Sequence, residues 1–153
     1  MRHNALRDMT AEHIQDSTGT PAMVEQHNEA HGDDRRPDIH YQDHRGETTW
    51  LDVAVVSPNA RTQAGRTMRA GAAVAAHEST KRRKYPALKL LPLVTSHLGR
   101  AGQDLTTFVR ALHRHPDSAV RSADIAGFWQ SWSCCLQHWN VKILASAGLL
   151  TPP

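Results

Sequence analysis

The sequence predicts a mixed fold of the α/β type (α+β mixed), in which helices flank a central mixed β-sheet and a helical extension follows at the C-terminus. Two observations predict this class. Three runs over 36–43, 47–56 and 88–96 have the length and residue types of strands. Helical patterns lie before, between and after these runs, which is typical of a sheet covered by helices. With 153 residues, the chain is long enough to bury a substantial core as one domain.

The N-terminal segment begins with a helical pattern. Apolar residues recur among charged ones and predict a weakly amphipathic helix over 3–17, which the sequence TGTP ends. A short strand is expected over 22–25. The polar stretch 27–36 is expected to form a loop.

The two runs that follow are expected to pair as a β-hairpin. A three-residue loop, HRG, separates them, and Gly46 suits the left-handed position of such a loop. Asp43 and Glu47 then close the hairpin, and the numbers of every opposed pair add up to 90. In this register Asp38 faces Asp52.

Two carboxylates directly opposed on a β pair repel each other, since their Cβ atoms lie only about 5 Å apart. A cation between them removes the repulsion, and a hard divalent ion such as Mg²⁺ (or Mn²⁺) prefers oxygen ligands. The alternative interpretation is that Asp38 lies at a loop end beside Arg35 and Arg36, while Asp52 sits on a solvent-facing pleat. Both interpretations remain open on spacing alone.

A helix is expected from Arg61 to about Tyr85, because Pro86 disfavours helical geometry in the residue before it. Its small residues form a narrow face suited to packing against a sheet: Ala64, Met68, Ala72, Ala75 and Ala76.

The same helix carries a basic run near its end. His77, Lys81 and Lys84 lie on one face, and a lysine beside a carboxylate pair can stabilise negative charge on an attacked phosphodiester. The clustered charge favours an anionic partner such as DNA. The alternative is a solvated basic helix end that complements the helix dipole.

The remaining elements are a buried strand and two helices. The strand over 88–96 is expected to be broken early by Pro92, and a helix is expected over 103–115. The last helix, over about 122–147, carries an apolar stripe that is expected to lie in the core: Ile125, Phe128, Trp129, Trp132, Leu136, Trp139 and Ile143. The predicted order is α-β-β-β-α-β-α-α, with a core over 1–100 and the C-terminal helices of 101–153 packing on the same domain.

Several compositional features exclude other classes. No window approaches the length of apolar sequence that a membrane span needs, so no membrane partner and an intracellular location are expected. Cys134 and Cys135 are adjacent in a predicted helix and cannot easily close a disulfide. The eleven histidines are scattered and are interpreted as surface residues. Trp50 lies on the same pleat face as Asp52, and its role, in the core or in binding, is left open.

Four motifs occur in an order that resembles a known family. They are RHN near the start, RRPDI, LDVAVVSP and HESTKRRKYP. The chain resembles, over nearly its whole length, the restriction-like endonuclease domain of site-specific non-LTR retrotransposons of the R2 type. That domain follows a reverse transcriptase and belongs to the PD-(D/E)XK nucleases, which have a mixed β-sheet flanked by helices and a divalent-metal site on a β-hairpin.

The resemblance implies a metal site built on the hairpin. Pro37-Asp38 matches the PD motif and Asp52 the second acidic residue. The backbone carbonyl of Val53 is a further candidate metal ligand, and Glu25 matches an acidic residue that the family places before the PD motif.

The resemblance also implies where the basic residues come from. Ala54 stands where many nucleases of this class have a lysine, and in R2-like domains the following helix supplies it. Here that helix offers Lys81 or Lys84, with Tyr85 beside them.

Candidate nucleic-acid-binding residues come from two segments of the chain. They are Arg2, His3 and Asn4 of the RHN motif and Lys81, Arg82, Arg83 and Lys84 of the basic run.

The implied function is a Mg²⁺-dependent (or Mn²⁺-dependent) DNA endonuclease that nicks a target strand, acts in the nucleus, and is normally fused to an upstream reverse transcriptase module. Two alternatives stay open: a catalytically inactive DNA-binding remnant of such a domain, and a helical interaction domain without a nucleic-acid role.

Overall fold

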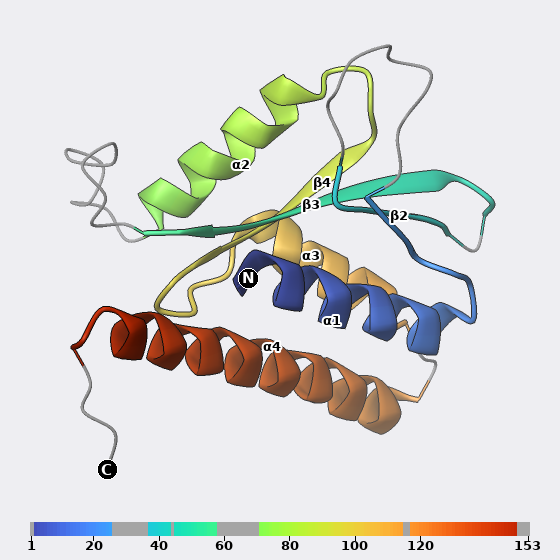
Figure 1. Ribbon diagram of the computed structural model, residues 1–153. Helices are drawn as coiled ribbons and strands as arrows, with labels where there is room; N and C mark the ends of the chain where they lie inside the picture. Colours follow the sequence, from blue (N-terminus) through green and yellow to red (C-terminus); the bar gives the residue numbers. More distant parts are fainter. Residues whose placement is uncertain (1, 26–36, 44, 58–70, 115–116, 150–153) are drawn as a thin grey trace.

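The computed structural model describes residues 2–25, 37–43, 45–57, 71–114 and 117–149 (Figure 1). The elements follow in the predicted order, α-β-β-β-α-β-α-α. They are α1 (Arg2–Thr18), β1 (Met23–Val24), β2 (Ile39–Gln42), β3 (Thr48–Val56), α2 (Ala72–Lys84), β4 (Leu90–Ser96), α3 (Gln103–Leu112) and α4 (Ser118–Ser146).

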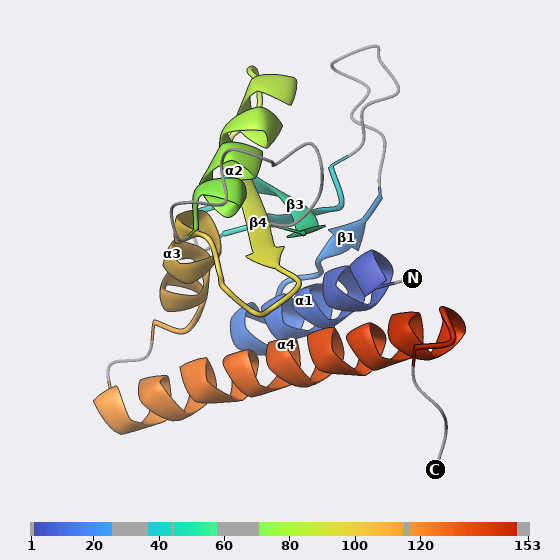
Figure 2. The same ribbon diagram turned by 90° about the vertical axis from the view of Figure 1, so that its left-hand side faces the viewer.

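The sheet is mixed, as the sequence predicts. Its strand order is β1-β2-β3-β4; β2 pairs antiparallel with both β1 and β3, and β4 pairs parallel with β3. Helix α2 covers one face, α1 and α3 lie against the other, and α4 packs beneath them (Figures 1 and 2). The sheet is therefore the middle layer between α2 and the remaining helices.

The alternation of side chains along β3 divides the core between the two faces. Leu51 and Val53 belong to the larger apolar cluster, on the side of α1, α3 and α4. Ala54 and Val56 point the other way and pack with Val74 of α2. Asp52 has the same parity as Ala54, so its side chain faces α2.

The hairpin between β2 and β3 has the predicted register. Gly46 has φ of 77°, the Asp43 N–H donates to the Glu47 carbonyl at 2.9 Å, and the paired residues include Ile39 with Leu51. Their numbers add up to 90, which places Asp38 opposite Asp52 at the point where β2 begins.

Helix α2 differs from the sequence-based prediction at its start. It begins at Ala72, after Gly71 adopts a left-handed φ of 85°, and the expected residues 58–70 lie outside the described part of the chain. Ala75 is exposed, whereas Ala73, Val74 and Glu78 are buried. The buried face is shifted because Glu78, a charged residue that pattern analysis assigns to the surface, reaches the start of α3. The predicted end at Tyr85 is confirmed.

Pro92 does not break β4, contrary to the sequence-based prediction. In the described chain β4 lies at the edge of the sheet. The backbone N–H and carbonyl groups of its odd-numbered residues point toward β3, as shown by the bonds from Trp50 N–H to the Lys89 carbonyl and from His97 N–H to the Val56 carbonyl. Pro92 has even parity, so the nitrogen that lacks a hydrogen points away from the ladder.

Helix α4 starts earlier than predicted, and its C-terminal half is less buried. The Asp117 carboxylate caps it by accepting from Ala119 N–H at 2.7 Å, which sets the start at Ser118. Phe128, Trp132 and Leu136 are buried, whereas Ile143 is 46% exposed, so its assignment to the core was wrong. The reason is length: α4 has 29 residues and α1 has 17, and the last turns of α4 reach past the larger apolar cluster.

The remaining predictions concern single features. Helix α3 ends at Leu112, before the predicted 115, while the 27–36 loop lies outside the described residues. Trp129 and Trp139, predicted as core, are half-buried. Cys134 and Cys135 are free thiols. Across the described chain, no helix combines the length and the apolar character that crossing a bilayer requires.

Candidate active site

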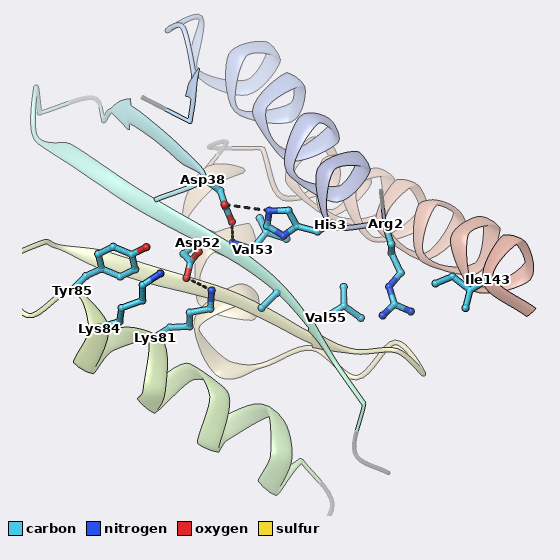
Figure 3. Close-up of a pocket in the computed structure, with 11 residues that line it drawn as sticks. Arg2, His3, Asp38, Asp52, Val53, Val55, Lys81, Lys84, Tyr85 and Ile143 are labelled. Carbon is cyan, nitrogen blue, oxygen red and sulfur yellow. Dashed lines mark hydrogen bonds and ion pairs between the residues drawn. The ribbon is translucent and has the colours of Figure 1, made fainter. Parts of the chain in front are cut away.

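A pocket of about 550 Å³ opens at the edge of the sheet where β3 continues past the start of β2. Helix α1 lies on one side of this edge and α2 on the other (Figure 3). Two carboxylates and four basic side chains line the pocket: Asp38, Asp52, Arg2, His3, Lys81 and Lys84. The fold therefore brings together residues that are up to 82 positions apart in the sequence.

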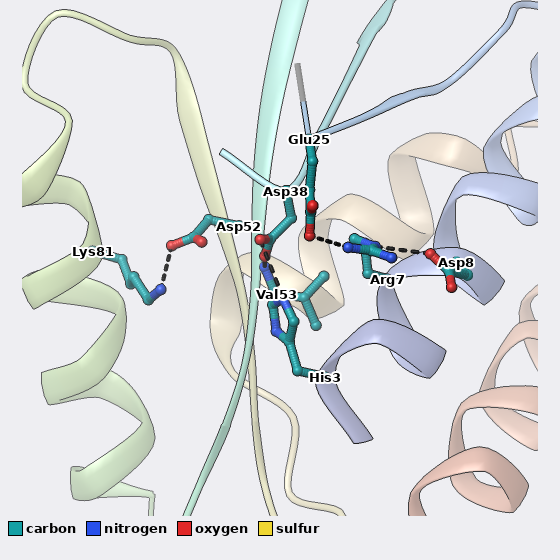
Figure 4. Close-up of polar contacts among 8 residues, drawn as sticks. All are labelled: His3, Arg7, Asp8, Glu25, Asp38, Asp52, Val53 and Lys81. Atoms are coloured by element: carbon teal, nitrogen blue, oxygen red, sulfur yellow. Dashed lines mark hydrogen bonds and ion pairs between the residues drawn. The ribbon is translucent and has the colours of Figure 1, made fainter. Parts of the chain in front are cut away.

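Asp38 is fixed by both its backbone and its side chain. Its N–H donates to the Leu51 carbonyl at 3.0 Å, and its carbonyl accepts from Glu25 N–H at 2.9 Å. The carboxylate Oδ2 accepts from Val53 N–H at 2.6 Å, and Oδ1 lies 3.2 Å from Nε2 of His3 (Figure 4). Asp38 directly precedes β2 and is buried, with 8% of its surface exposed, while Arg35 and Arg36, its neighbours in the alternative interpretation, lie outside the described residues.

Asp52 is buried, with 3% of its surface exposed, and Oδ2 lies 2.7 Å from Nζ of Lys81. Burial raises the pKa of Asp52, the ammonium of Lys81 opposes this rise, and the neighbouring Asp38 adds to it. The alternative of a solvent-facing pleat is therefore wrong. The helix that follows the hairpin therefore places one of its two candidate lysines, Lys81, beside the Asp52 carboxylate.

His3 closes the α1 side of the site. Its hydrogen bond with Asp38 raises its pKa, burial opposes that rise, and the charges of Asp38 and Asp52 reinforce it. The His3 imidazole and the Lys81 ammonium stand on opposite sides of the two carboxylates (Figure 4). The like charges that the register places together are each matched by a basic group.

Lys84 and Tyr85 lie at one end of the pocket. Nζ of Lys84 is 4.9 Å from the centre of the Tyr85 ring, and Figure 3 shows the Tyr85 hydroxyl pointing toward Asp52. Tyr85 itself is 4% exposed. Lys81 thus contacts the Asp52 carboxylate, and Lys84 lies over the Tyr85 ring.

Four other candidate residues lie outside the pocket. Arg82 forms an ion pair with Asp104 of α3, and Arg83 is exposed and reaches Thr80. Asn4 is exposed on α1. The fourth is Glu25.

Glu25 is exposed and forms an ion pair with Arg7 rather than with a residue of the pocket (Figure 4). Its backbone bond to Asp38 keeps it beside the site.

The oxygen atoms of the site suit a small divalent cation. Asp38 and Asp52 supply carboxylates, and the N–H of Val53 points at Asp38, so its carbonyl, which lies on the same side of an extended strand, points there too. Mg²⁺ is usually held by one or two carboxylates and keeps several waters. Within the described residues, no group of three or more His, Cys, Asp or Glu side chains forms a metal-binding cluster, so a cation here would depend on the carbonyl and on water.

Two residues that matter for the site were missed by sequence reasoning. Ile143 was assigned to the core but lines the pocket, and Asn140 of α4 bonds to Arg2 at 2.8 Å. Asn140 falls on the same helical face as Phe128, Trp132 and Leu136, so a polar residue interrupting an apolar stripe was the available signal. Comparison of the sequence with protein-family models and with curated proteins finds no match.

Proposed function

We propose that the protein is a Mg²⁺-dependent (or Mn²⁺-dependent) DNA endonuclease that nicks one strand by phosphodiester hydrolysis. The observation that carries this proposal is the contact between Lys81 and Asp52, with Asp38 opposite, at the edge of the sheet. A buried carboxylate pair beside a lysine, in a pocket lined by further basic groups, combines the cation ligands and the positive charge that phosphodiester hydrolysis requires.

Each residue has a role that follows from its position. Asp38 and Asp52, with the Val53 carbonyl, would hold the divalent ion, which supplies an activated water when bound. Lys81 stabilises the negative charge that develops on the pentavalent phosphoryl group. Lys84 lies farther along the pocket, where it can contact a neighbouring phosphate, and Tyr85 shapes the wall beside it.

The resemblance to R2-type retrotransposon endonuclease domains supports the same chemistry. It further supports retroelement origin, fusion to an upstream reverse transcriptase module, and action in the nucleus. The order of the secondary-structure elements and the mixed sheet agree with the fold that this resemblance implies.

A plasmid-nicking assay tests the proposal. Purified protein is incubated with supercoiled plasmid in Mg²⁺, Mn²⁺ or EDTA, and conversion to open circles is measured. Lys81→Met is expected to lower the nicking rate by about 100-fold or more, because the developing charge loses its nearest cation. DNA binding by this variant should remain within about threefold of wild type, since one phosphate contact contributes little to the total.

Lys89→Met is the matched control, because Lys89 is an exposed lysine paired with Glu47 at the far end of the hairpin. It should nick at the wild-type rate. Activity that persists in EDTA, or in Lys81→Met, would contradict the proposed chemistry.

A second candidate function is favoured by the same ion pair. Because Lys81 already pairs with Asp52, part of the negative charge of the site is balanced without a metal, as it would be in a catalytically inactive DNA-binding remnant. For that function, wild-type protein should bind duplex DNA but leave the plasmid supercoiled in every metal.

A further inference from the structure

Arg2 stands apart from the other basic residues of the pocket. Figure 3 shows it with Ile143 at the end opposite Lys84 and Tyr85, with the two carboxylates between. Its guanidinium is partly buried, and burial lowers its pKa. Among the described residues, no carboxylate lies within ion-pair distance of it.

The bond that holds Arg2 comes from a neutral group. Nη1 of Arg2 donates to Oδ1 of Asn140 at 2.8 Å. An amide oxygen orients a guanidinium without cancelling its charge, whereas a carboxylate would do both. A partly buried arginine that keeps its full charge at the wall of a pocket is suited to binding an anion.

Asn140 is itself fixed to the sheet. Its Nδ2 donates to the backbone carbonyl of His97, just after β4, at 2.7 Å. The His97 N–H in turn donates to the carbonyl of Val56 at the end of β3. One side chain of α4 therefore ties α1 to the C-terminal end of β3, the strand that carries Asp52.

We propose that Asn140 is a positioning residue that holds Arg2 as the binding group for a DNA phosphate next to the one that is cut. The inference rests on the proposed function, because the anion is taken to be a phosphodiester of the same DNA strand. It gives α4 a part in the site: its polar residue orients a phosphate contact, and Ile143 supplies the adjoining wall.

Binding of a fluorescent DNA duplex in EDTA, measured by anisotropy over a series of salt concentrations, tests the inference without requiring cleavage. Arg2→Gln should reduce the log–log salt slope by about one unit, as expected for one lost phosphate contact. Asn140→Asp keeps an acceptor for Arg2, loses the donor to the His97 carbonyl and adds a charge that neutralises Arg2, so it should lower the slope to a similar extent. Asn140→Ala should weaken binding because Arg2 loses its orientation.

The test of positioning is the double variant. If Asn140 acts through Arg2, Asn140→Ala should have no further effect on DNA binding when Arg2→Gln is already present. A purely structural role for Asn140 would weaken binding equally in both backgrounds and would overturn the inference, as would wild-type binding by Arg2→Gln.

Gln130→Asp is the matched control for charge. It places the same negative charge on an exposed position of α4, about 15 Å along the helix from Asn140 at 1.5 Å per residue, and should leave the salt slope unchanged.

The experiments distinguish failure of the proposed nuclease activity from failure of the proposed role of Asn140. Wild-type protein that never nicks, but whose DNA binding depends on Arg2 and Asn140, contradicts only the nuclease activity; nicking with binding indifferent to both residues contradicts only this inference.

Discussion

Asp52 shows how a single residue can be costly to bury and still be held in place. Its carboxylate is almost fully buried, and its pKa is raised by burial even though Lys81 lies 2.7 Å away. The ion pair therefore offsets only part of the desolvation. Asp38, by contrast, has a backbone N–H and His3 as partners for its two oxygens. The two opposed acids are stabilised in different ways, one mainly by a helix lysine and the other mainly by the strand backbone.

Asp52→Asn is predicted to abolish divalent-ion binding while changing the free energy of unfolding by no more than about 1 kcal/mol. The amide relieves repulsion with Asp38, and its oxygen can still accept a hydrogen bond from the Lys81 ammonium, which lies against this position. Isothermal titration with Mn²⁺ and urea unfolding would measure the two effects. Unchanged Mn²⁺ binding in this variant would show that the site is assigned wrongly.

The pH dependence of stability should also change in this variant. Because the folded pKa of Asp52 is raised, the folded chain holds this proton more tightly than the unfolded chain does. Asp52 therefore contributes stability below its unfolded pKa of 3.8, and that contribution is lost as pH rises through the folded pKa. Asp52→Asn should lack this decrease when unfolding is measured across the acid range. Glu47→Gln, an exposed acid at the hairpin turn, is the control.

At the scale of elements, α2 is held in position by an unusual contact with α3. The buried Glu78 of α2 places Oε1 3.1 Å from the N–H of Asp104, in the first turn of α3. Burial raises the pKa of Glu78, while the backbone N–H groups of Asp104 and Gln103 oppose that rise. A carboxylate at a helix N-terminus is favourable because it meets unpaired N–H groups. Lys81 lies one turn further along α2, so this contact sets the position from which Lys81 reaches Asp52.

Gly102→Ala is predicted to destabilise the fold by about 1–3 kcal/mol. A Cβ at this position would lie 2.0 Å from Oε1 of Glu78, so the carboxylate would have to leave the start of α3. Gly127→Ala is the matched control, since Gly127 lies inside α4 with open space around it and should gain about 0.5–1 kcal/mol. Urea unfolding measures the free energy of unfolding of both variants, which should decrease for Gly102→Ala and increase for Gly127→Ala. Equal stability of Gly102→Ala and wild type would contradict the role given to Glu78.

The junction of α1, the end of α3 and α4 should respond to pH through His113. This residue is buried beside Phe128, and its Nδ1 lies 3.3 Å from Oγ of Ser17. Burial lowers its pKa; Asp124 opposes that shift and His13 adds to it. The unfolded chain therefore binds this proton more readily, so the stability contributed by neutral His113 is present above about pH 6.5 and is lost as pH falls.

His113→Leu should flatten the decline in stability between about pH 7 and pH 5 relative to wild type. Thermal unfolding at a series of pH values measures this decline. The exposed His138→Leu serves as control and should keep the wild-type pH profile. A profile for His113→Leu that follows wild type would rule out His113 as the source.

At the scale of the whole molecule, the basic groups gather around one edge of the sheet. Arg2 and His3 come from α1, and Lys81 and Lys84 from α2, on opposite faces. The net charge of the chain is only +3, so this local concentration, and not the total, would attract DNA. Arg82 forms an ion pair with Asp104 and therefore contributes less to the positive potential around this edge.

Duplex DNA binding is therefore predicted to weaken steeply with salt, and Lys84→Ala should lower the log–log slope by about one unit. Lys142→Ala is the matched control. Lys84 lies 4.9 Å from the centre of the Tyr85 ring and Lys142 lies 4.7 Å from the centre of a Trp139 ring one helical turn away, but Lys142 does not line the pocket. A binding constant that stays flat between low and moderate salt would remove nucleic acid from the proposed function.

The sequence by itself determined the features that depend on local geometry. The order of the elements and the end of α2 before Pro86 follow from periodicity and from backbone restrictions. The register that opposes Asp38 to Asp52 follows from the three-residue loop and the left-handed Gly46, because a turn of fixed length leaves only one pairing.

Only the tertiary structure decided how distant elements meet. It brought Lys81 to Asp52, because this contact depends on how α2 is rotated on the sheet, and the buried contact of Glu78 with α3 sets that rotation. It placed Pro92 on an edge strand, where its nitrogen points away from β3 and no hydrogen bond of the sheet is lost. It also brought Asn140 against Arg2, 138 residues away in the sequence. Local sequence patterns specify what each segment prefers, whereas these contacts arise from packing between segments, which no pattern within one segment encodes.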